Sequence, residues 1–338
     1  MIKVGIAGAR GYTGRELIRY LLRHPEVKIT SLWAHEIKPQ GEIFSDLCPE
    51  FKGLLDIKIR PFSPSEVKNL DVVFLALPHT VSMKFVPKII EKVNLVIDLS
   101  GDYRLKSPNV YKKWYKVTHS DCKNLRTAVY GLPEINREKI RNARLIANPG
   151  CYPSGIILGL YPLVREKLIA NVSIIVDSKS GVSGAGRKKD IALLFAEVNE
   201  DVRPYKINDH QHIPEILQVL GIKSQKKFSF IPQVVPLTRG IINMIYIFFP
   251  SRFSEDIFSI YKNCYKDEPL IRIYGKQEIP QLKNVLHTSF CDLGYFNWLN
   301  ERTFLIISCV DNLGKGAAGQ AVHNMNIALG LEETLGLL

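Results

Sequence analysis

The chain has few of the features that direct a protein into a membrane or out of the cell. No apolar run in its 338 residues approaches the length of a membrane-spanning helix. The first residues, Met1–Gly5, enter a strand-like segment at once and lack the charged and apolar regions of a signal peptide. We therefore expect a cytoplasmic protein without a membrane partner.

Patterns of metal ligands and disulfides are also missing. The six cysteines are scattered, form no CxxC pair and show no metal-ligand spacing with the eight histidines. The sequence therefore predicts reduced thiols and no metal site. Burial as a small apolar side chain is the expected role of Cys48, Cys122, Cys264, Cys291 and Cys309.

Acidic residues are too few to balance the basic ones. The chain holds 45 lysines and arginines against 33 aspartates and glutamates, which gives a net charge of +12. It nevertheless contains no long basic block and no basic stripe interleaved with aromatics, the patterns typical of nucleic-acid binding. A cationic cleft for the phosphate and carboxylate groups of small molecules accounts better for the charge.

The length of 338 residues is too great for a typical single core and suits two domains that share an active-site cleft. In the first half, short apolar segments alternate with helical ones. This pattern predicts an α/β domain with a Rossmann-type, doubly wound parallel sheet. The predicted strands cover about residues 3–8, 28–34, 72–76, 95–98 and 144–147, and an amphipathic helix covers 14–24.

Later segments are richer in β-branched residues, and their connections are polar or rich in glycine. They predict a second, α+β domain with a mixed or antiparallel sheet. Its predicted strands are 172–177, 228–236, 241–249 and 304–309, with a helix over 254–266. A last helix, over 316–331, has one face of small residues that packs back on the first domain. The predicted domains are residues 1–148 with 316–338, and residues 149–315.

The surroundings of Cys151 carry the strongest chemical signal. An apolar strand ends at Ala147, and a helix predicted over 154–167 follows, with Pro153 suited to a first helical position. Unpaired backbone N–H groups and the positive end of the helix dipole would then face the sulfur and favour the thiolate. Cys151 is therefore the predicted nucleophile.

The glycine-rich segment Gly8–Gly14 follows the first predicted strand and opens the first helix. Such glycines permit a tight turn and a close approach of the backbone to a pyrophosphate at the helix N-terminus, although the spacing is GxxGxxG rather than GxGxxG. After the second strand, Glu36 argues for NAD. His35, Lys38 and Arg10 could instead hold the 2′-phosphate of NADP, which we favour.

A nucleophilic thiol beside a nicotinamide needs a base. Two histidines occur in the segment Asn208–Ile216, where His212 precedes a Pro-Glu-Ile helix start. His210 points the other way if the pair is extended, so only one of them reaches the cysteine. His212 is the favoured acid and base, because imidazole titrates near neutral pH.

Further segments suit phosphate and carboxylate ligands. Leu77–His79 and Leu99–Gly101 follow the third and fourth strands, at the carboxyl ends where ligands of such sheets bind. Three segments offer arginines, whose planar fork matches these anions but also serves in ordinary surface pairs. These are Arg104, the glycine-rich loop 180–188 with Arg187 and Lys188, and the turn 236–240 with Arg239.

Seven motifs, in order from residue 2 to about 336, resemble the N-acetyl-γ-glutamyl-phosphate reductases of arginine biosynthesis. They are Gly8–Gly14, Leu77–His79, Asp98–Arg104, Asn148–Ser154, residues 180–188, His210–Ile216 and Asp311–Gly316. The resemblance implies an NADPH-dependent reduction of N-acetyl-γ-glutamyl phosphate to N-acetyl-L-glutamate 5-semialdehyde, with release of phosphate, by a homodimer or homotetramer. Cys151 would form a thioester, His212 would activate the thiol, and the helix amides after Cys151 would stabilise the oxyanion.

Pattern and resemblance together assign the binding residues. NADP(H) would contact Gly8, Arg10, Gly11, Tyr12, Thr13, Gly14, His35, Pro78, Ser100, Ser180, Gly181 and Asn312. The acyl phosphate and inorganic phosphate would contact Arg104, Asn148, Ser154, Arg187 and Arg239.

The chain departs from the family pattern at three places. Ser154 stands where threonine is usual, and it retains the hydroxyl. Gln211 replaces an arginine between the histidines, which removes a cation from the substrate site. The segment Trp33–Glu36 replaces a turn with serine or arginine, so it bears on the choice between NAD and NADP.

Alternatives remain within and outside the enzyme class. A sister enzyme of lysine biosynthesis reduces an aminoadipyl phosphate on an acidic carrier protein, but its cysteine motif is Gly-Ala-Gly-Cys-Asn rather than Asn-Pro-Gly-Cys-Tyr. Aspartate-semialdehyde dehydrogenase also differs around its cysteine. A cofactor-binding module without turnover would be expected to lack Cys151 or His212, and both are present.

Overall fold

The computed structural model describes residues 1–187, 190–253 and 255–338. Lys188, in the predicted glycine-rich loop, and Ser254, at the start of a predicted helix, lie outside these residues. The chain forms two compact units: unit 1 comprises residues 1–150 and 317–338, and unit 2 comprises residues 151–316. Within the described ranges, no helix has the length and apolar character that a membrane crossing requires.

Unit 1 is built on one sheet in the strand order β3-β4-β2-β1-β5-β6-β8-β7. Its strands are β1 (Ile2–Ala7), β2 (Val27–Trp33), β3 (Glu42–Ile43), β4 (Lys58–Arg60), β5 (Val72–Leu75), β6 (Leu95–Asp98), β7 (Val129–Tyr130) and β8 (Leu145–Ala147). Its α-helices are α1 (Tyr12–Arg23), α2 (Phe44–Leu47), α3 (Ser82–Ile89), α4 (Pro108–Tyr115), α5 (Cys122–Thr127), α6 (Pro133–Arg141) and α11 (Gly319–Ala328).

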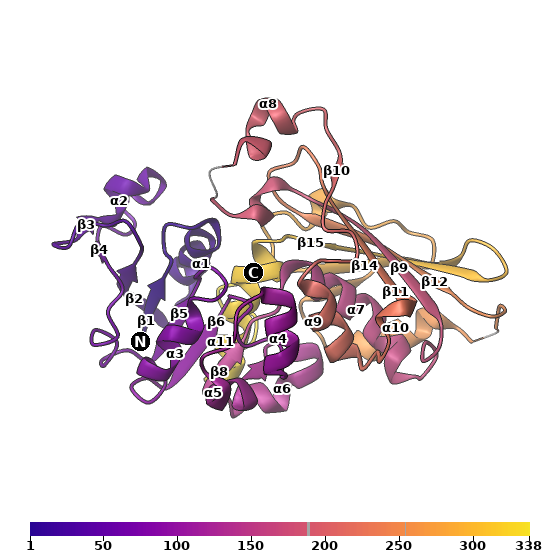
Figure 1. Cartoon of the computed structure of the whole chain (residues 1–338), viewed down its shortest axis with the longest axis horizontal. Helices are drawn as coiled ribbons and strands as arrows, with labels where there is room; N and C mark the ends of the chain where they lie inside the picture. The colour runs from indigo at the N-terminus through magenta and orange to yellow at the C-terminus, as the bar shows by residue number, and fades with distance from the viewer. Residues whose placement is uncertain (188–189, 254) are drawn as a thin grey trace. The chain divides into compact units, whose positions relative to one another are not determined.

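Among the described residues, the neighbouring strands of this sheet pair in parallel, except β3 with β4. From β1 the sheet grows to β2 on one side and to β5, β6 and β8 on the other, which is the doubly wound arrangement predicted from the sequence. Helix α11 contacts α1 and α6, and these helices are labelled in Figure 1. Residues of α3, α4 and α5 join a core cluster with strand residues such as Val73 and Val96. The α/β prediction for the first part of the chain is confirmed.

Unit 2 contains a seven-stranded sheet in the order β10-β11-β9-β12-β15-β14-β13. Its strands are β9 (Ser173–Ser180), β10 (Arg203–Pro204), β11 (Phe228–Val234), β12 (Ile241–Phe248), β13 (Ile271–Ile273), β14 (Cys291–Trp298) and β15 (Thr303–Val310). Its α-helices are α7 (Cys151–Arg165), α8 (Phe195–Val198), α9 (His212–Leu220) and α10 (Ile257–Tyr265).

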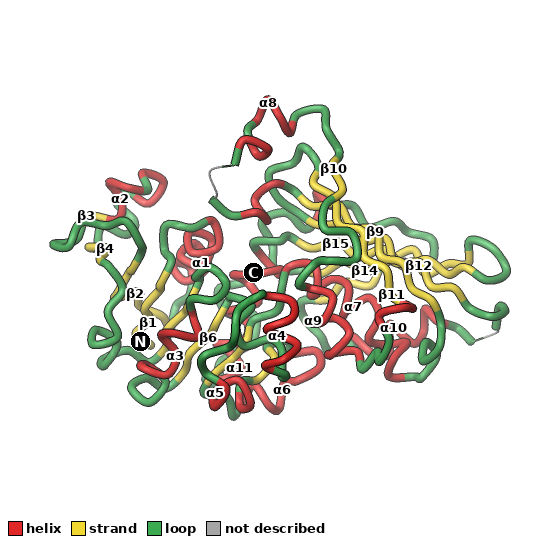
Figure 2. Tube along the Cα trace, viewed as in Figure 1, coloured by secondary structure: helices red, strands yellow, loops and turns green. Residues whose placement is uncertain are grey.

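This sheet is mixed, because β9 pairs in parallel with β11 and antiparallel with β12. Buried and less buried residues alternate along β12, as expected of a strand with one covered face. Helix α7 packs against β12 and β15, and α9 and α10 pack against α7. Figure 2 shows these long strands in yellow and the helices in red. The predicted α+β domain with a mixed sheet is confirmed.

The four helix starts predicted at 14, 154, 254 and 316 differ from the observed starts of α1, α7, α10 and α11, and those of α7 and α11 bear on the candidate site. Helix α7 begins at Cys151 instead of Ser154, since a proline at the third position removes an N–H that would have no intrahelical partner. At the C-terminus, a π-helical turn over Gly314–Ala318 precedes α11. Cys151 is therefore itself the first helical residue rather than a loop residue before the helix.

Candidate active site

Cys151 is partly buried at the N-terminal end of α7. The first N–H groups of a helix have no intrahelical acceptor, and with the helix dipole they favour a negative sulfur. Gly316 lies against the cysteine: a Cβ added to Gly316 would be 3.0 Å from the Cβ of Cys151. The N–H of Gly316 also donates to the carbonyl oxygen of Asp311 at 2.8 Å. The nucleophile predicted from the sequence is thus packed against a glycine from the end of unit 2.

The two candidate histidines lie together at the start of α9, the helix that packs against α7. The ring centroids of His210 and His212 are 4.6 Å apart, and they lie 5.7 and 5.9 Å from the ring of Tyr152. The predicted extended pair is wrong, because Gln211 has helical angles, with φ −62° and ψ −11°. Both rings therefore contact the residue next to Cys151.

A backbone contact restricts the protonation of His210. The N–H of His212 donates to Nδ1 of His210 at 3.1 Å. A ring nitrogen that accepts a hydrogen bond carries no proton, so His210 in this arrangement holds its proton on Nε2. His210 cannot become doubly protonated without losing this bond. His212 is the first residue of α9.

Tyr152 and Tyr205 complete the surroundings of the histidines. Their phenolic oxygens are 3.1 Å apart, and the ring of Tyr205 lies 5.7 Å from that of His210. Burial raises the pKa of Tyr205 to about 12, and negative charge on Cys151 adds to this rise. Sequence reasoning missed Tyr205, because it belongs to a loop segment with no motif of its own. A neutral phenol at neutral pH therefore stands near the cysteine and His210.

Three segments distant in sequence join near the end of β9. The N–H groups of Val182 and Ser183 donate to the carbonyl oxygens of Leu237 and Thr238, at 2.8 and 3.0 Å. The side chain of Asn312 accepts from the N–H of Gly240 at 2.7 Å and donates to the hydroxyl of Ser183 at 3.0 Å.

No side chain would fit at Gly181, since its Cβ would lie 2.6 Å from the backbone nitrogen of Arg239. The predicted residues Ser180, Gly181, Arg239 and Asn312 are thus brought together in unit 2.

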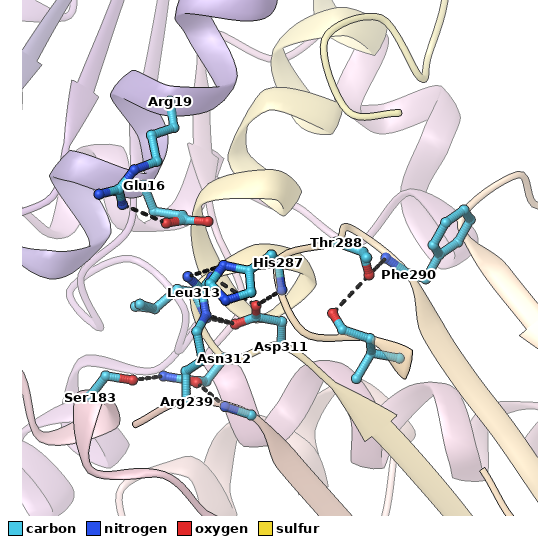
Figure 3. A network of polar contacts seen from close by, with 12 residues as sticks. Glu16, Arg19, Ser183, Arg239, His287, Thr288, Phe290, Asp311, Asn312 and Leu313 are labelled. Atoms are coloured by element: carbon cyan, nitrogen blue, oxygen red, sulfur yellow. Dashed lines mark hydrogen bonds and ion pairs between the residues drawn. The ribbon is translucent and has the colours of Figure 1, made fainter. Parts of the chain in front are cut away.

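Arg239 is held by a carboxylate that sequence reasoning did not pair with it. Its Nε lies 3.0 Å from Oδ1 of the fully buried Asp311, and its Nη2 lies 2.7 Å from Oδ2 (Figure 3). Nη1 is 3.0 Å from Nδ1 of His287, and Asp311 also accepts from the N–H of Leu313 at 2.9 Å. The charge of Arg239 is therefore matched inside the protein. Arg187, by contrast, is exposed.

In unit 1, the glycine turn after β1 has the geometry of a phosphate cradle. Gly8 has φ +87°, and a Cβ there would meet the carbonyl oxygen of Ala76 at 2.1 Å. A Cβ on Gly14 would lie 2.3 Å from the oxygen of Gly8. At Gly11, the N-cap of α1, no side chain caps the helix, and its first turn contains no acidic residue. These residues fit a pyrophosphate at the helix N-terminus.

The remaining cofactor candidates lie around this turn or at other strand ends of unit 1. Nη1 of Arg10 donates to the carbonyl oxygen of Glu36, after β2, at 3.4 Å. His35 and Pro78 are exposed, as is Tyr12 in the first turn of α1, where Thr13 is partly buried. The structure therefore brings Arg10 to the end of β2, where a dinucleotide places its ribose.

Ser100 follows β6 and is tied to buried acids. Its hydroxyl donates to Oδ2 of Asp98 at 2.8 Å and accepts from the N–H of Asp102 at 3.1 Å. Burial raises the pKa of Asp98 to about 7, and the negative charge of Asp102 contributes to this rise. The N–H of Gly101 donates to Nδ1 of His79 at 2.8 Å, which links the ends of β5 and β6.

The predicted substrate residues fall into separate places. In unit 1, the buried Arg104 donates from Nε to the carbonyl oxygen of Asn148 and from Nη2 to that of Leu99, both at 2.8 Å. In unit 2, Ser154 is buried in the first turns of α7. The structure therefore brings Arg104 together with Asn148, and Arg239 together with Asn312, within their own units.

Comparison with known proteins agrees with the division of the chain into units 1 and 2. The model of the semialdehyde dehydrogenase NAD-binding domain matches residues 3–143, and that of the semialdehyde dehydrogenase dimerisation domain matches residues 151–312. Relatives named N-acetyl-gamma-glutamyl-phosphate reductase include one from Alkaliphilus metalliredigens, 42% identical, and one from Caldicellulosiruptor saccharolyticus, 44% identical. Each match covers 100% of this chain and 98% of the relative.

Solved structures show the same fold. An aspartate semialdehyde dehydrogenase from Candida albicans, crystallised with NADP, has a TM-score of 0.70 at 18% identity and covers 97% of this chain and 98% of that chain. The Vibrio cholerae aspartate semialdehyde dehydrogenase II complexed with ASA has a TM-score of 0.70 at 17% identity, with 98% of both chains covered. The resemblance predicted from the seven motifs is confirmed by the relatives.

Proposed function

The chain belongs to the N-acetyl-γ-glutamyl-phosphate reductases of the semialdehyde dehydrogenase family, and we propose that it reduces N-acetyl-γ-glutamyl phosphate to N-acetyl-L-glutamate 5-semialdehyde with NADPH and releases phosphate. The observation that carries the proposal is Cys151 at the start of α7, beside a helix that begins with His212. An activated thiol with a base nearby is what acyl transfer from a phosphate requires.

The thiolate of Cys151 attacks the acyl carbon of the substrate. The bond between that carbon and the phosphate oxygen breaks, phosphate leaves with the electron pair, and a thioester remains on Cys151. A reduced nicotinamide, when bound, would supply the hydride that converts the thioester to a thiohemiacetal. When the thiohemiacetal loses its hydroxyl proton, the C–S bond breaks, and the aldehyde and the thiolate are released.

The two histidines receive different roles. His212 takes the thiol proton, gives a proton to the oxygen as the thiohemiacetal forms, and takes it back when the aldehyde leaves. His210 accepts the backbone N–H of His212 through Nδ1 and is the second candidate for this work. The backbone N–H groups at the start of α7 stabilise the oxyanion.

NADP(H) is the proposed cofactor. The turn over Gly8–Gly14 with the first turn of α1 would hold the pyrophosphate, as the uncapped helix start supports. Arg10, beside the backbone of Glu36, and His35 would hold the 2′-phosphate. Pro78, Ser100, Ser180, Gly181 and Asn312 stay predictions as further cofactor contacts.

The substrate residues and the assembly are also proposals. Arg104, Asn148, Ser154, Arg187 and Arg239 stay predictions for the acyl phosphate and inorganic phosphate. We propose residues 1–148 with 316–338 as the dinucleotide-binding domain, and residues 149–315 as the catalytic and oligomerisation domain of a homodimer or homotetramer. The cytoplasm, with its reduced thiols, is the proposed location.

A steady-state assay of the reverse reaction tests substrate and cofactor together. Free N-acetyl-L-glutamate 5-semialdehyde, phosphate and NADP should give phosphate-dependent formation of NADPH, faster than NADH forms from NAD. Absence of turnover with the free semialdehyde would contradict the proposal and favour a carrier-linked substrate.

Substitution of the nucleophile tests the covalent route. C151S should abolish turnover while NADP binding, followed by fluorescence titration, survives. C122S is the matched control, because Cys122 is also partly buried but lies in α5, and its turnover should match that of the unsubstituted protein. Retained turnover in C151S would exclude the thioester.

A further inference from the structure

The chain leaves unit 1 between Gly150 and Cys151 and returns to it between Gly316 and Ala317. We call the residues around the first point the outgoing segment and those around the second point the returning segment. Asn148, which is 1% exposed, lies just before the first point. Its Nδ2 donates to the carbonyl oxygen of Ala317 at 3.1 Å. The outgoing and the returning segments are therefore joined by a hydrogen bond within unit 1.

Every polar group of Asn148 has a partner. The backbone N–H donates to the carbonyl oxygen of Asp98, and the backbone carbonyl accepts from Nε of Arg104, both at 2.8 Å. Oδ1 accepts from Nδ2 of Asn324 at 3.0 Å. Since Asn324 donates to one end of the amide, the other end must be the donor that reaches Ala317. An amide fits this position, and a carboxylate does not.

In unit 2, the same two segments meet at the nucleophile. The Cβ that an alanine would carry at position 316 lies 3.0 Å from Cβ and 3.2 Å from Cα of Cys151. Ala317, the acceptor of the Asn148 amide, is the next residue. Displacement of the returning segment would therefore act directly on the backbone of Cys151.

We propose that Asn148 is a positioning residue for the nucleophile: by bonding the returning segment, it sets the place of Cys151 against Gly316 at the start of α7. Its four polar groups all have partners within the protein, which supports this positioning role. The inference depends on the proposed function, because it takes Cys151 to be the nucleophile.

N148D tests the bond with little change of shape. The aspartate keeps an acceptor for Asn324 but turns a carboxylate oxygen toward the carbonyl of Ala317. We expect kcat to fall at least ~10-fold with KM within about threefold, because small misplacements of a reacting group lower the rate of the chemical step. Iodoacetamide alkylation of Cys151, followed against pH by mass spectrometry of its peptide, should show a raised thiol pKa, because the sulfur loses its place at the helix start.

Two further variants separate positioning from general loss of stability. N136D is the matched control, because Nδ2 of Asn136 also donates to a backbone carbonyl, that of Tyr130, at 3.1 Å in unit 1. It should keep the kcat and the alkylation profile of the unsubstituted protein. G316A leaves the amide bonds in place but pushes on Cys151, and should reproduce the N148D effects even where N148D fails to fold.

Unchanged alkylation profiles and kcat in a folded N148D would overturn the inference. Where N148D does not fold, the same result in G316A overturns it. If the unsubstituted protein shows no reductase activity, the proposed function fails. The alkylation profiles then still decide whether Asn148 sets the environment of Cys151, so the two failures are distinguishable.

Discussion

Each unit buries a carboxylate beside the segments of the candidate site, but the two carboxylates are compensated differently. In unit 2, Asp311 lies against the guanidinium of Arg239, an opposite charge. In unit 1, Asp98 lies near Asp102, a like charge, and its pKa is raised to about 7 by burial and by that neighbour. One carboxylate is balanced by a cation and the other by a proton, which predicts different responses to mutation and to pH.

The largest effect should come from breaking the opposite-charge pair. R239M leaves Asp311, which is 0% exposed, without its cation, and removal of one partner of a buried pair typically costs about 3–5 kcal/mol. Urea unfolding of the whole protein should show a loss of this size. R187M, at an exposed arginine, should stay within about 0.5 kcal/mol of the unsubstituted protein. If R239M lost less than about 0.5 kcal/mol, the Arg239–Asp311 pair would not be a major source of stability.

A smaller loss is expected where the like-charge pair is broken. Asp102 accepts hydrogen bonds from the N–H of Thr80 at 2.6 Å, the N–H of Met83 at 3.0 Å and the hydroxyl of Tyr111 at 2.7 Å. D102N turns an NH₂ group toward donors, which costs about 1–3 kcal/mol for a buried polar group left unpaired. Removal of the like charge partly offsets this loss, because it lowers the pKa of Asp98. Urea unfolding at pH 7 should therefore rank D102N between R239M and R187M.

The spacing of Asp98 and Asp102 is visible in the sequence, but their burial is not. Asp102, for example, is bonded by Met83 of α3 and Tyr111 of α4, which come from other segments. The same holds for Asp311, whose partner Arg239 is distant along the chain. Strand β6 was predicted with its observed bounds, Leu95–Asp98, because a continuous apolar run between polar residues is a local signal. The short strands β3, β4 and β7 carry no such run and were missed.

In the candidate site, too, local features were predicted from the sequence and features that depend on distant segments were not. Cys151 was recognised from its immediate neighbours, since a strand, a turn and a helix start are all local. The common orientation of His210 and His212 was not, because it depends on helical backbone at Gln211, where the packing of α9 on α7 matters. Tyr205 and the bonds of Asn148 were also beyond sequence reasoning, since their partners come from other segments.

A change spread over several pH units should reveal the proton on Asp98. Its pKa is about 7 in the folded protein and near 3.8 in the unfolded chain, so the folded state binds more protons between these values. The stabilisation is complete below about pH 3.8 and is lost as the pH rises through 7. D98N cannot titrate, and its melting temperature should therefore rise relative to that of the unsubstituted protein from pH 4 to pH 8. A constant difference would mean that Asp98 does not hold a proton in the folded state.

The smallest effect, of opposite sign, is expected at Glu333, where the hydrogen bond from His323 and then that from Arg137 lower the pKa to about 2. A carboxyl whose pKa is lowered on folding stabilises the protein at pH values above 4.5, its pKa in the unfolded chain. This stabilisation is lost as the pH falls toward 2. The group is partly exposed, so E333Q should cost only about 0.5–1 kcal/mol at pH 7. Thermal melts should show this difference shrinking from pH 5 to pH 3, the reverse of the D98N trend. If the melting-temperature differences of E333Q and D98N changed with pH in the same direction, the two carboxyl groups would not differ in how their charge is balanced.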